Sequence, residues 1–285
     1  MKDDMEHKNS IASTKRAEKF AFGIIKFCGI ITIIILVAII GKILINGIPH
    51  LSWDFLTKEP ENMGREGGIF SVIITTIYLT LFSIIIAGPI GVCAAIFLTE
   101  YAKEGIILKT IRFGTESLAG VPSIIFGLFG YVFFVVALNL KYSIVSGGLT
   151  LTLMIIPTII RTSEEAIKAV PVSYREGSLA LGATKWQTIY KVVIPAAMPG
   201  IMTGIILGIG RVIGETAAVI FTAGSSLGLP ESIWRPGRTM AVHLYILASE
   251  GLSQGNTYAT ATVLIITVLI INLIANKLMK KLSKA

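Results

Sequence analysis

The sequence predicts an all-α membrane protein, a polytopic bundle of six transmembrane helices. Three observations support this class. Hydrophobic residues make up 53% of the 285 residues and charged residues only 15%, well below the quarter that is usual in soluble domains. Six apolar runs are each long enough to cross a hydrocarbon core of about 30 Å. Lysine and arginine gather in alternate loops, which is the charge pattern of oriented membrane helices.

The apolar runs follow one another with polar segments between them. A charged arm, residues 1–19, precedes the first run and is expected to be disordered or interfacial. No signal-peptide cleavage pattern follows the first run, so we expect a retained span. Gly88-Pro89 predicts a kink in the second run, and Pro157 is expected to interrupt the fourth. The runs extend from about Phe20 to Ile45, between Glu66 and Glu100, between Glu116 and Lys141, between Lys141 and Arg161, from Pro195 to about Ala223, and from about Tyr258 to Ala275.

The loop charges predict the orientation of the bundle. Eighteen Lys and Arg residues lie in the N-terminal segment up to Lys26, in the segments after the second and fourth runs and in the C-terminal segment from Lys277, against five in the alternate loops. The positive-inside rule therefore places both termini in the cytoplasm. A turn at Arg211 and Glu215 would make seven spans and send the lysine-rich C-terminus outside, so six spans are predicted.

This order divides the chain into four parts: a cytoplasmic arm (1–19), the first span with its outer loop (20–66), the main transmembrane domain (67–277) and a basic cytoplasmic tail (278–285). Within the main domain, the segment from Tyr101 to Gly120 predicts an amphipathic helix on the membrane face or under the bundle. In the outer loop 225–257, a short helix is expected from Thr239 to Ser249. Arg235 and Arg238, just before it, either attract anions or contact lipid head groups.

The sequence lacks the residues that several classes of function require. Cys28 and Cys93 lie in apolar runs, so free buried thiols are expected. The three histidines have no metal-ligand spacing, and we predict neither a metal site nor a cofactor. No phosphate-binding loop of the form G-x-x-x-x-G-K-[ST] and no nucleophile or acid pair is visible, so the chain is not expected to be an enzyme. The net charge of +8 reflects membrane orientation rather than nucleic-acid binding.

The fifth run carries a charged residue that is costly in a membrane. Arg211 lies about 18 Å beyond Pro199 along a helix, near the middle of the core, where an arginine costs about 2.5–3.5 kcal/mol. Glu215 is one turn later, so the two side chains can pair. Two interpretations stay open: an ion pair that fixes helix packing, or a polar site facing a central cavity, where the guanidinium fork suits oxyanions. Arg161, near the cytoplasmic end of the fourth run, is a further candidate for the same pathway.

The fifth run also contains four glycines at helical spacing. Gly204 with Gly208, and Gly210 with Gly214, form two small-xxx-small pairs, which predict the close approach of a second helix.

The polar segment 173–195 predicts two short helices around a glycine. Ser173 and Glu176 have the spacing of a capping box, and Gly182 can adopt the left-handed conformation that ends a helix. A second capping box and a restart at Pro195 are predicted after it. The second box is formed by Thr184 and Gln187, and the residues expected on one face of the following helix are Trp186, Ile189, Tyr190 and Val193.

The spacing of Glu176, Gly182 and Pro195 resembles the EAA loop of ABC importer permeases. Gly177 and Ser178 stand where that loop usually has alanines, and the last apolar positions are also conservatively changed. The resemblance implies a type I ABC importer permease fold in which this loop docks onto an ATP-binding subunit. Glu176, Gly182 and Pro195 would then be the ATPase-coupling residues, and the motor would lie on another chain.

Two further segments, GRVIGETAAVIFTAGSS and PGRTMAVHLY, resemble the permeases of phosphate ABC importers, and the likeness extends from Trp53 onward. It implies a subunit that moves inorganic phosphate across a bacterial or archaeal cytoplasmic membrane. The implied partners are a sister permease, a dimer of ATP-binding subunits, an extracytoplasmic phosphate-binding protein and membrane lipid. It also implies that Arg211 is important for phosphate passage. Ala217 and Ala218 favour one of the two sister permeases, since the other usually has Met-Ala-Val after this motif.

Three alternatives remain beside this reading. A permease for molybdate or sulfate would keep the docking loop but need not keep GRTMAVHLY. The sister phosphate permease shares the G-R-x-x-G-E-T pattern. An ion-coupled secondary transporter would need no docking loop and often shows inverted repeats, which the sequence does not show.

Overall fold

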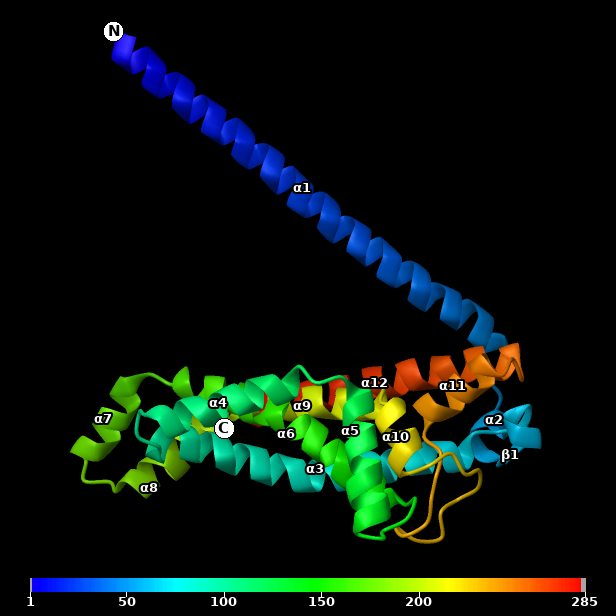
Figure 1. The fold of residues 1–285 in the computed structure, drawn as a ribbon. Coiled ribbons are helices and arrows are strands. Elements are labelled where there is room, and N and C mark those ends of the chain that lie inside the picture. The colour runs from blue at the N-terminus through cyan, green and yellow to red at the C-terminus, as the bar shows by residue number, and fades with distance from the viewer. Residues whose placement is uncertain (1, 283–285) are drawn as a thin grey trace.

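The computed structural model describes residues 2–282 and is largely helical (Figure 1). The α-helices are α1 (Lys2–Gly47), α2 (Trp53–Thr57), α3 (Phe70–Ile96), α4 (Ile106–Ala119), α5 (Ser123–Gly130), α6 (Ile144–Lys168), α7 (Val172–Ala180), α8 (Lys185–Thr188), α9 (Ile194–Ile213), α10 (Ala217–Thr222), α11 (Met240–Ser249) and α12 (Gln254–Leu282). Three π-helical segments extend or join them: η3 (Phe97–Tyr101), η4 (Tyr131–Ala137) and η5 (Ile189–Val193). Short 3-10 turns are η1 (Ile48–His50) and η2 (Asn62–Gly64), and a two-stranded hairpin pairs β1 (Pro60–Glu61) with β2 (Glu66–Gly67).

The described part of the chain has five helices long and apolar enough to span a membrane, and six if one bent pair counts as a span. The bent pair is α4 followed by α5 with η4, and the angle between its two arms is 100°. The second arm rises only about 22 Å at 1.5 Å per residue. The predicted third span is therefore short, and the predicted amphipathic helix α4 lies across its end.

Helix α6 is the centre of the bundle. In the most apolar stretch of α6, 72% of the residues are buried, whereas this share does not exceed 33% in the other candidate spans. It packs between α3 and α9 because its apolar residues face both. The central core contains Leu79 and Ala87 of α3, Leu151, Met154, Ile155 and Ile159 of α6, Val212 of α9, and Ala218 and Val219 of α10.

Glycine determines how closely α9 approaches α6. A Cβ atom at Gly204 would overlap the hydroxyl of Thr162 on α6, and one at Gly208 would lie 3.6 Å from Ile159. The first predicted small-residue pair is thus confirmed as a helix contact. The second is wrong within this chain: a Cβ at Gly210 would meet nothing within 4 Å, and one at Gly214 would meet only the carbonyl of Gly210. Gly214 caps the C-terminal end of α9, and a Cβ atom at this position would contact no other helix in the described part of the chain.

We expect Gly204→Ala to lower the thermal unfolding midpoint of the detergent-solubilised complex, whereas Gly210→Ala leaves it nearly unchanged. Overpacking a close helix contact costs about 1–3 kcal/mol, while Gly210 has free space around it in this chain. Differential scanning calorimetry of both variants checks the prediction. Equal midpoints for the two variants would contradict the close packing of α6 on α9.

Three predictions about the spans need correction. The N-terminal arm is helical and continuous with the first span, because no proline interrupts the chain between Lys2 and Gly47. Helix α6 runs through Pro157 without a break, since a single missing N–H is tolerated in a long, well-packed helix. Cys28 and Cys93 are free, as predicted, but exposed on the outside of the bundle rather than buried.

The loops for which a function was predicted lie at the two ends of the bundle (Figure 1). At one end lie α4, α7, α8 and the C-terminal end of α12, and at the other end lie α2, β1 and α11. The C-terminal end of α1 packs against α12, and the rest of α1 leaves the bundle at an angle. The predicted assignment of loops to two sides is therefore consistent with the fold, while the basic tail lies partly outside the described residues.

Candidate functional site

The segment between α6 and α9, which we call the α7–α8 loop, folds as the two predicted helices, α7 and α8. Gly182 has φ +83° and follows α7 in the left-handed region. The N–H of Gly182 donates to the Leu179 carbonyl at 2.9 Å, and the N–H of Ala183 donates to the Ser178 carbonyl at 3.2 Å. This pattern is a Schellman motif, which satisfies the last carbonyls of α7. The predicted capping box of Thr184 and Gln187 is also present and opens α8.

Other predictions about this loop are wrong. Helix α7 begins at Val172 after Pro171 and has no side-chain cap, so Ser173 and Glu176 form no capping box. Pro171 occupies the N-cap position with φ −55°, and its ring offers no acceptor for the first N–H groups of α7. Glu176 lies within α7 and is exposed. Pro195 lies in the first turn of α9, but the predicted restart does not occur, because α8, η5 and α9 form one continuous helical segment from Lys185 to Ile213.

The stripe of apolar residues after Gly182 divides into two faces. The rings of Trp186 and Tyr190 stack on each other at 6.2 Å between centroids and remain exposed. Ile189 and Val193 are buried in the bundle. The prediction of a single face is therefore wrong, because the stripe is wide enough to lie partly inside the bundle and partly outside it.

The outer surface of the loop is apolar although it projects from the bundle. Leu181 is 91% exposed. Exposed apolar patches on a projecting element mark contacts with other proteins. The exposed apolar side chains are Val172, Tyr174, Leu179, Leu181, Trp186 and Tyr190.

Arg211 lies in the last turn of α9 and reaches α6. Its Nη1 donates to the Thr158 hydroxyl at 3.5 Å. Thr158 is 14 residues from the start of α6 and ten from its end, about 21 and 15 Å along the axis. The contact therefore places Arg211 beside the middle of the most central span, as the sequence predicted from distance alone.

Glu215 does not pair with Arg211. Helix α9 ends at Ile213 and α10 starts at Ala217, so the one-turn spacing assumed for a continuous helix is lost at Gly214. The Glu215 carboxylate, in a residue only 9% exposed, accepts the N–H of Ala218 at 3.1 Å. It caps the first turn of α10, where a negative charge also suits the helix dipole. The predicted ion pair is replaced by a helix cap, and no ion pair of Arg211 occurs among the residues whose side chains are described.

Arg161 is on the same side of α6 as Thr158, because residues three apart in a helix are neighbours. Its Nε lies 3.3 Å from Oε1 of Glu165, and both side chains are exposed. Arg161 and Arg211 are thus brought to one open face, formed by α6 and α9. We call this the α6–α9 face; it carries Thr158, Arg161, Glu165 and Arg211.

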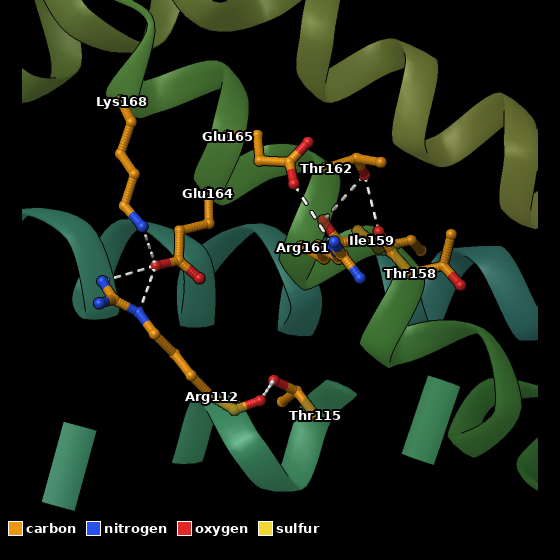
Figure 2. A network of polar contacts seen from close by, with 9 residues as sticks. All are labelled: Arg112, Thr115, Thr158, Ile159, Arg161, Thr162, Glu164, Glu165 and Lys168. Atoms are coloured by element: carbon orange, nitrogen blue, oxygen red, sulfur yellow. Dashed lines mark hydrogen bonds and ion pairs between the residues drawn. The ribbon is translucent and has the colours of Figure 1, made fainter. Parts of the chain in front are cut away.

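Neighbouring carboxylates on α6 point in different directions (Figure 2). Glu165 turns to Arg161 on the α6–α9 face, whereas Glu164 is buried and faces α4. Oε1 of Glu164 lies 2.7 Å from Nη2 of Arg112 and 2.7 Å from Nζ of Lys168. Because a buried carboxylate needs such partners, this network fastens α4 to α6.

The outer loop separates its two arginines. Arg238 is 6% exposed; its Nε donates to the Ser225 carbonyl at 2.8 Å, and its Nη1 lies 3.5 Å from Nδ1 of His243. Burial lowers the pKa of Arg238, which the Glu250 carboxylate partly offsets. Arg238 therefore holds the loop against α11, which begins at its Thr239 cap as predicted. Arg235 instead lines a cavity of about 320 Å³ together with Glu231.

Sequence reasoning missed two residues of the site. Thr158 carried no signal, because a threonine in a membrane helix is common and usually bonds its own backbone. Arg175, beside Glu176, was counted only for orientation, yet it points into the bundle and pairs with Glu100 at 2.8 Å. Its position one residue before the exposed glutamate, about 100° around the helix, was the available signal.

Comparison with known proteins identifies relatives over most of the chain. Residues 87–285 match the family model described as the binding-protein-dependent transport system inner membrane component. The probable ABC transporter permease protein YqgI of Bacillus subtilis is 36% identical over 277 residues, which cover 92% of this chain and 94% of that protein. The phosphate transport system permease protein PstA of Haemophilus influenzae is 32% identical over 257 residues, covering 90% of this chain and 91% of that protein.

A solved structure has the same fold at low sequence identity. The crystal structure of a bacterial alginate ABC transporter, in complex with its alginate-bound periplasmic protein, contains a chain that matches with a TM-score of 0.64. The match is 14% identical and covers 91% of this chain and 95% of the other. At this identity the likeness shows the fold of an ABC importer permease.

Proposed function

The chain belongs to the family of binding-protein-dependent transport system inner membrane components, and we propose that it is the PstA-like permease subunit of an ATP-driven importer of inorganic phosphate. Membership makes it a multi-pass membrane subunit of an ABC transporter. Phosphate as the substrate rests on the relatives of that name and on the placement of Arg211. The described partner of Arg211 beside mid-span is a neutral hydroxyl and not a carboxylate, so its guanidinium group can bind an anion.

The α6–α9 face is our candidate for this chain's half of the pathway. Arg211 and Arg161 supply positive charge, Thr158 supplies a hydroxyl, and the face is open in the single chain. A sister permease, PstC-like, covers the face in this proposal and completes a transient cavity. Glu215 acts indirectly, since its cap keeps α10 in place after the break in α9.

ATP hydrolysis is assigned to a dimer of PstB-like subunits, because the chain has no phosphate-binding loop of its own. These subunits dock on the α7–α8 loop through Glu176 and the exposed apolar side chains, and their closure moves the spans. A PstS-like binding protein delivers phosphate at the opposite end, where α2, the β-hairpin and α11 lie (Figure 1). The Gly182 turn sets the shape of the docking loop, and Pro195 lies where the loop passes into α9.

The substrate is tested by ATP-dependent uptake of labelled phosphate into liposomes containing the complete complex. Excess unlabelled phosphate should abolish uptake, whereas sulfate and molybdate at the same concentration should leave most of it. Competition by molybdate or sulfate as strong as that by phosphate would favour the alternative oxyanion importer. Uptake that proceeds without ATP and without the ATP-binding subunits would favour a secondary transporter.

Orientation gives a second prediction. In a background with Cys28 and Cys93 replaced by alanine, Glu231→Cys should react with an impermeant maleimide in intact cells, and a cysteine appended after Ala285 should not. The charge count places the outer loop outside and both termini in the cytoplasm. Labelling after membrane permeabilisation is the control for the second position. Outside labelling of the C-terminal cysteine would overturn the orientation and the assignment of the α7–α8 loop to the cytoplasm.

A further inference from the structure

The α7–α8 loop is held to the membrane helices by few side chains. No residue of α7 is buried, so apolar packing contributes little to its attachment. The hydroxyls of Ser178 and Thr188 lie 2.9 Å apart and join α7 to α8. The polar contacts of the loop to other helices go to Glu100 in η3, which continues α3, and to the C-terminal end of α6.

Arg175 makes the main connection. Its Nε and Nη2 donate to Oε1 of Glu100 at 3.1 and 2.8 Å. Its Nη1 donates to the Val170 carbonyl at 2.7 Å, and its Nη2 also donates to the Ile167 carbonyl at 2.9 Å. One guanidinium therefore ties α7 to η3, the continuation of α3, and also binds carbonyls at and just after the C-terminal end of α6. A lysine has no fork and cannot make this set of bonds from one position.

The second helix of the loop reaches the same residue. Nζ of Lys185, the first residue of α8, donates to the backbone carbonyl of Glu100 and lies 4.8 Å from the centre of the Tyr101 ring. Glu100 is thus held by its carboxylate from α7 and by its carbonyl from α8. The pair is well shielded from water, with side chains 19% exposed for Arg175 and 10% for Glu100. Such shielding strengthens a charge-assisted hydrogen bond.

We propose that Arg175 and Glu100 form the junction through which movement of the docked α7–α8 loop is transmitted to α3. The proposal rests on the proposed coupling function of the loop. Arg175 is a positioning residue: its neighbour Glu176 is exposed for the partner, while Arg175 faces the bundle. Since α3 packs along α6, displacement of Glu100 also moves the helix that carries Thr158 and Arg161.

Loss of the junction should separate ATP hydrolysis from transport. In the reconstituted complex, we expect Arg175→Gln to keep the ATP-binding subunits bound and ATP hydrolysis within about twofold of wild type. Anion uptake per ATP hydrolysed should fall at least tenfold. Glu100→Gln keeps an acceptor oxygen and the carbonyl contacts of Arg175, so its ratio should fall less. Arg175→Lys should recover only part of the ratio.

Arg112→Gln is the matched control, because it breaks another Arg–Glu pair on α6 and α4 without touching α7. Its ratio of uptake to hydrolysis should stay near that of wild type. An equal fall in this control would show a general effect of removing an ion pair and would overturn the junction. Uptake and hydrolysis that decline together with the amount of assembled complex in Arg175→Gln and Glu100→Gln would also overturn it, since the pair would then only stabilise the fold.

The readout separates this inference from the function on which it rests. A wild-type complex that hydrolyses ATP but imports another oxyanion contradicts phosphate as substrate, and the ratio is then measured with that anion. If Arg175→Gln does not accumulate in the membrane, Glu100→Gln decides, and an unchanged ratio there rejects the junction.

Discussion

Arg211→Gln is expected to reduce phosphate uptake by about 100-fold or more while the complex remains assembled. Glutamine keeps a polar group beside Thr158 but loses the charge and the paired donors of the guanidinium fork. A hydrogen bond to a charged group contributes about 1.5–3 kcal/mol, and the fork supplies two of them to one oxyanion. Arg211→Lys should recover only part of the activity, because an ammonium group is a point charge without the fork.

The control for this prediction is Glu215→Gln, measured for assembled complex and for uptake. The glutamine oxygen can still accept the Ala218 N–H, so the cap on α10 and the assembly of the complex should persist. Uptake should change only mildly. If uptake in the Arg211 variants merely follows the amount of assembled complex, the transport role of Arg211 is rejected and a packing role replaces it.

Gly182→Val is expected to lower co-purification of the ATP-binding subunits about tenfold and to lower uptake with it, while the chain still inserts into the membrane. Gly182 has φ +83°, in the region where an L-residue costs about 1–2 kcal/mol, and a β-branched side chain is a genuine outlier there. Relief of that strain distorts the Schellman turn and misaligns α7 with α8. Because 1.4 kcal/mol is a tenfold change in an equilibrium, docking weakens by about this factor.

Gly182→Asn separates backbone strain from contact with the partner. Asparagine adopts the left-handed conformation far more readily than valine, and a Cβ at position 182 would meet nothing within 4 Å in this chain. We expect near-normal co-purification for Gly182→Asn. Equal losses in both variants would mean that any side chain at this position obstructs the partner, and normal binding of Gly182→Val would remove the docking role of the turn.

Local signals predicted most elements of the α7–α8 loop. Thr184 and Gln187 form the predicted capping box because they are three positions apart, so that the side chain of each residue binds the backbone N–H of the other. Gly182 takes the conformation that glycine alone adopts without a steric cost. The capping box predicted at Ser173 does not form because α7 begins earlier, directly after Pro171, and both possible starts satisfy similar local rules.

The sequence by itself determined the helical membrane-protein class, the distribution of charged loops, the helix before Glu250 and the Gly182 turn, because apolar length, charge sign and backbone preference are properties of short segments. Only the tertiary structure decided the partners of the charged residues. Arg211 meets Thr158, 53 positions away, and Arg175 meets Glu100, 75 positions away. The break at Gly214 turned Glu215 from a partner of Arg211 into a cap of α10. A buried charge takes whichever polar group the packed helices bring within hydrogen-bond distance, and helix packing depends on the whole bundle at once.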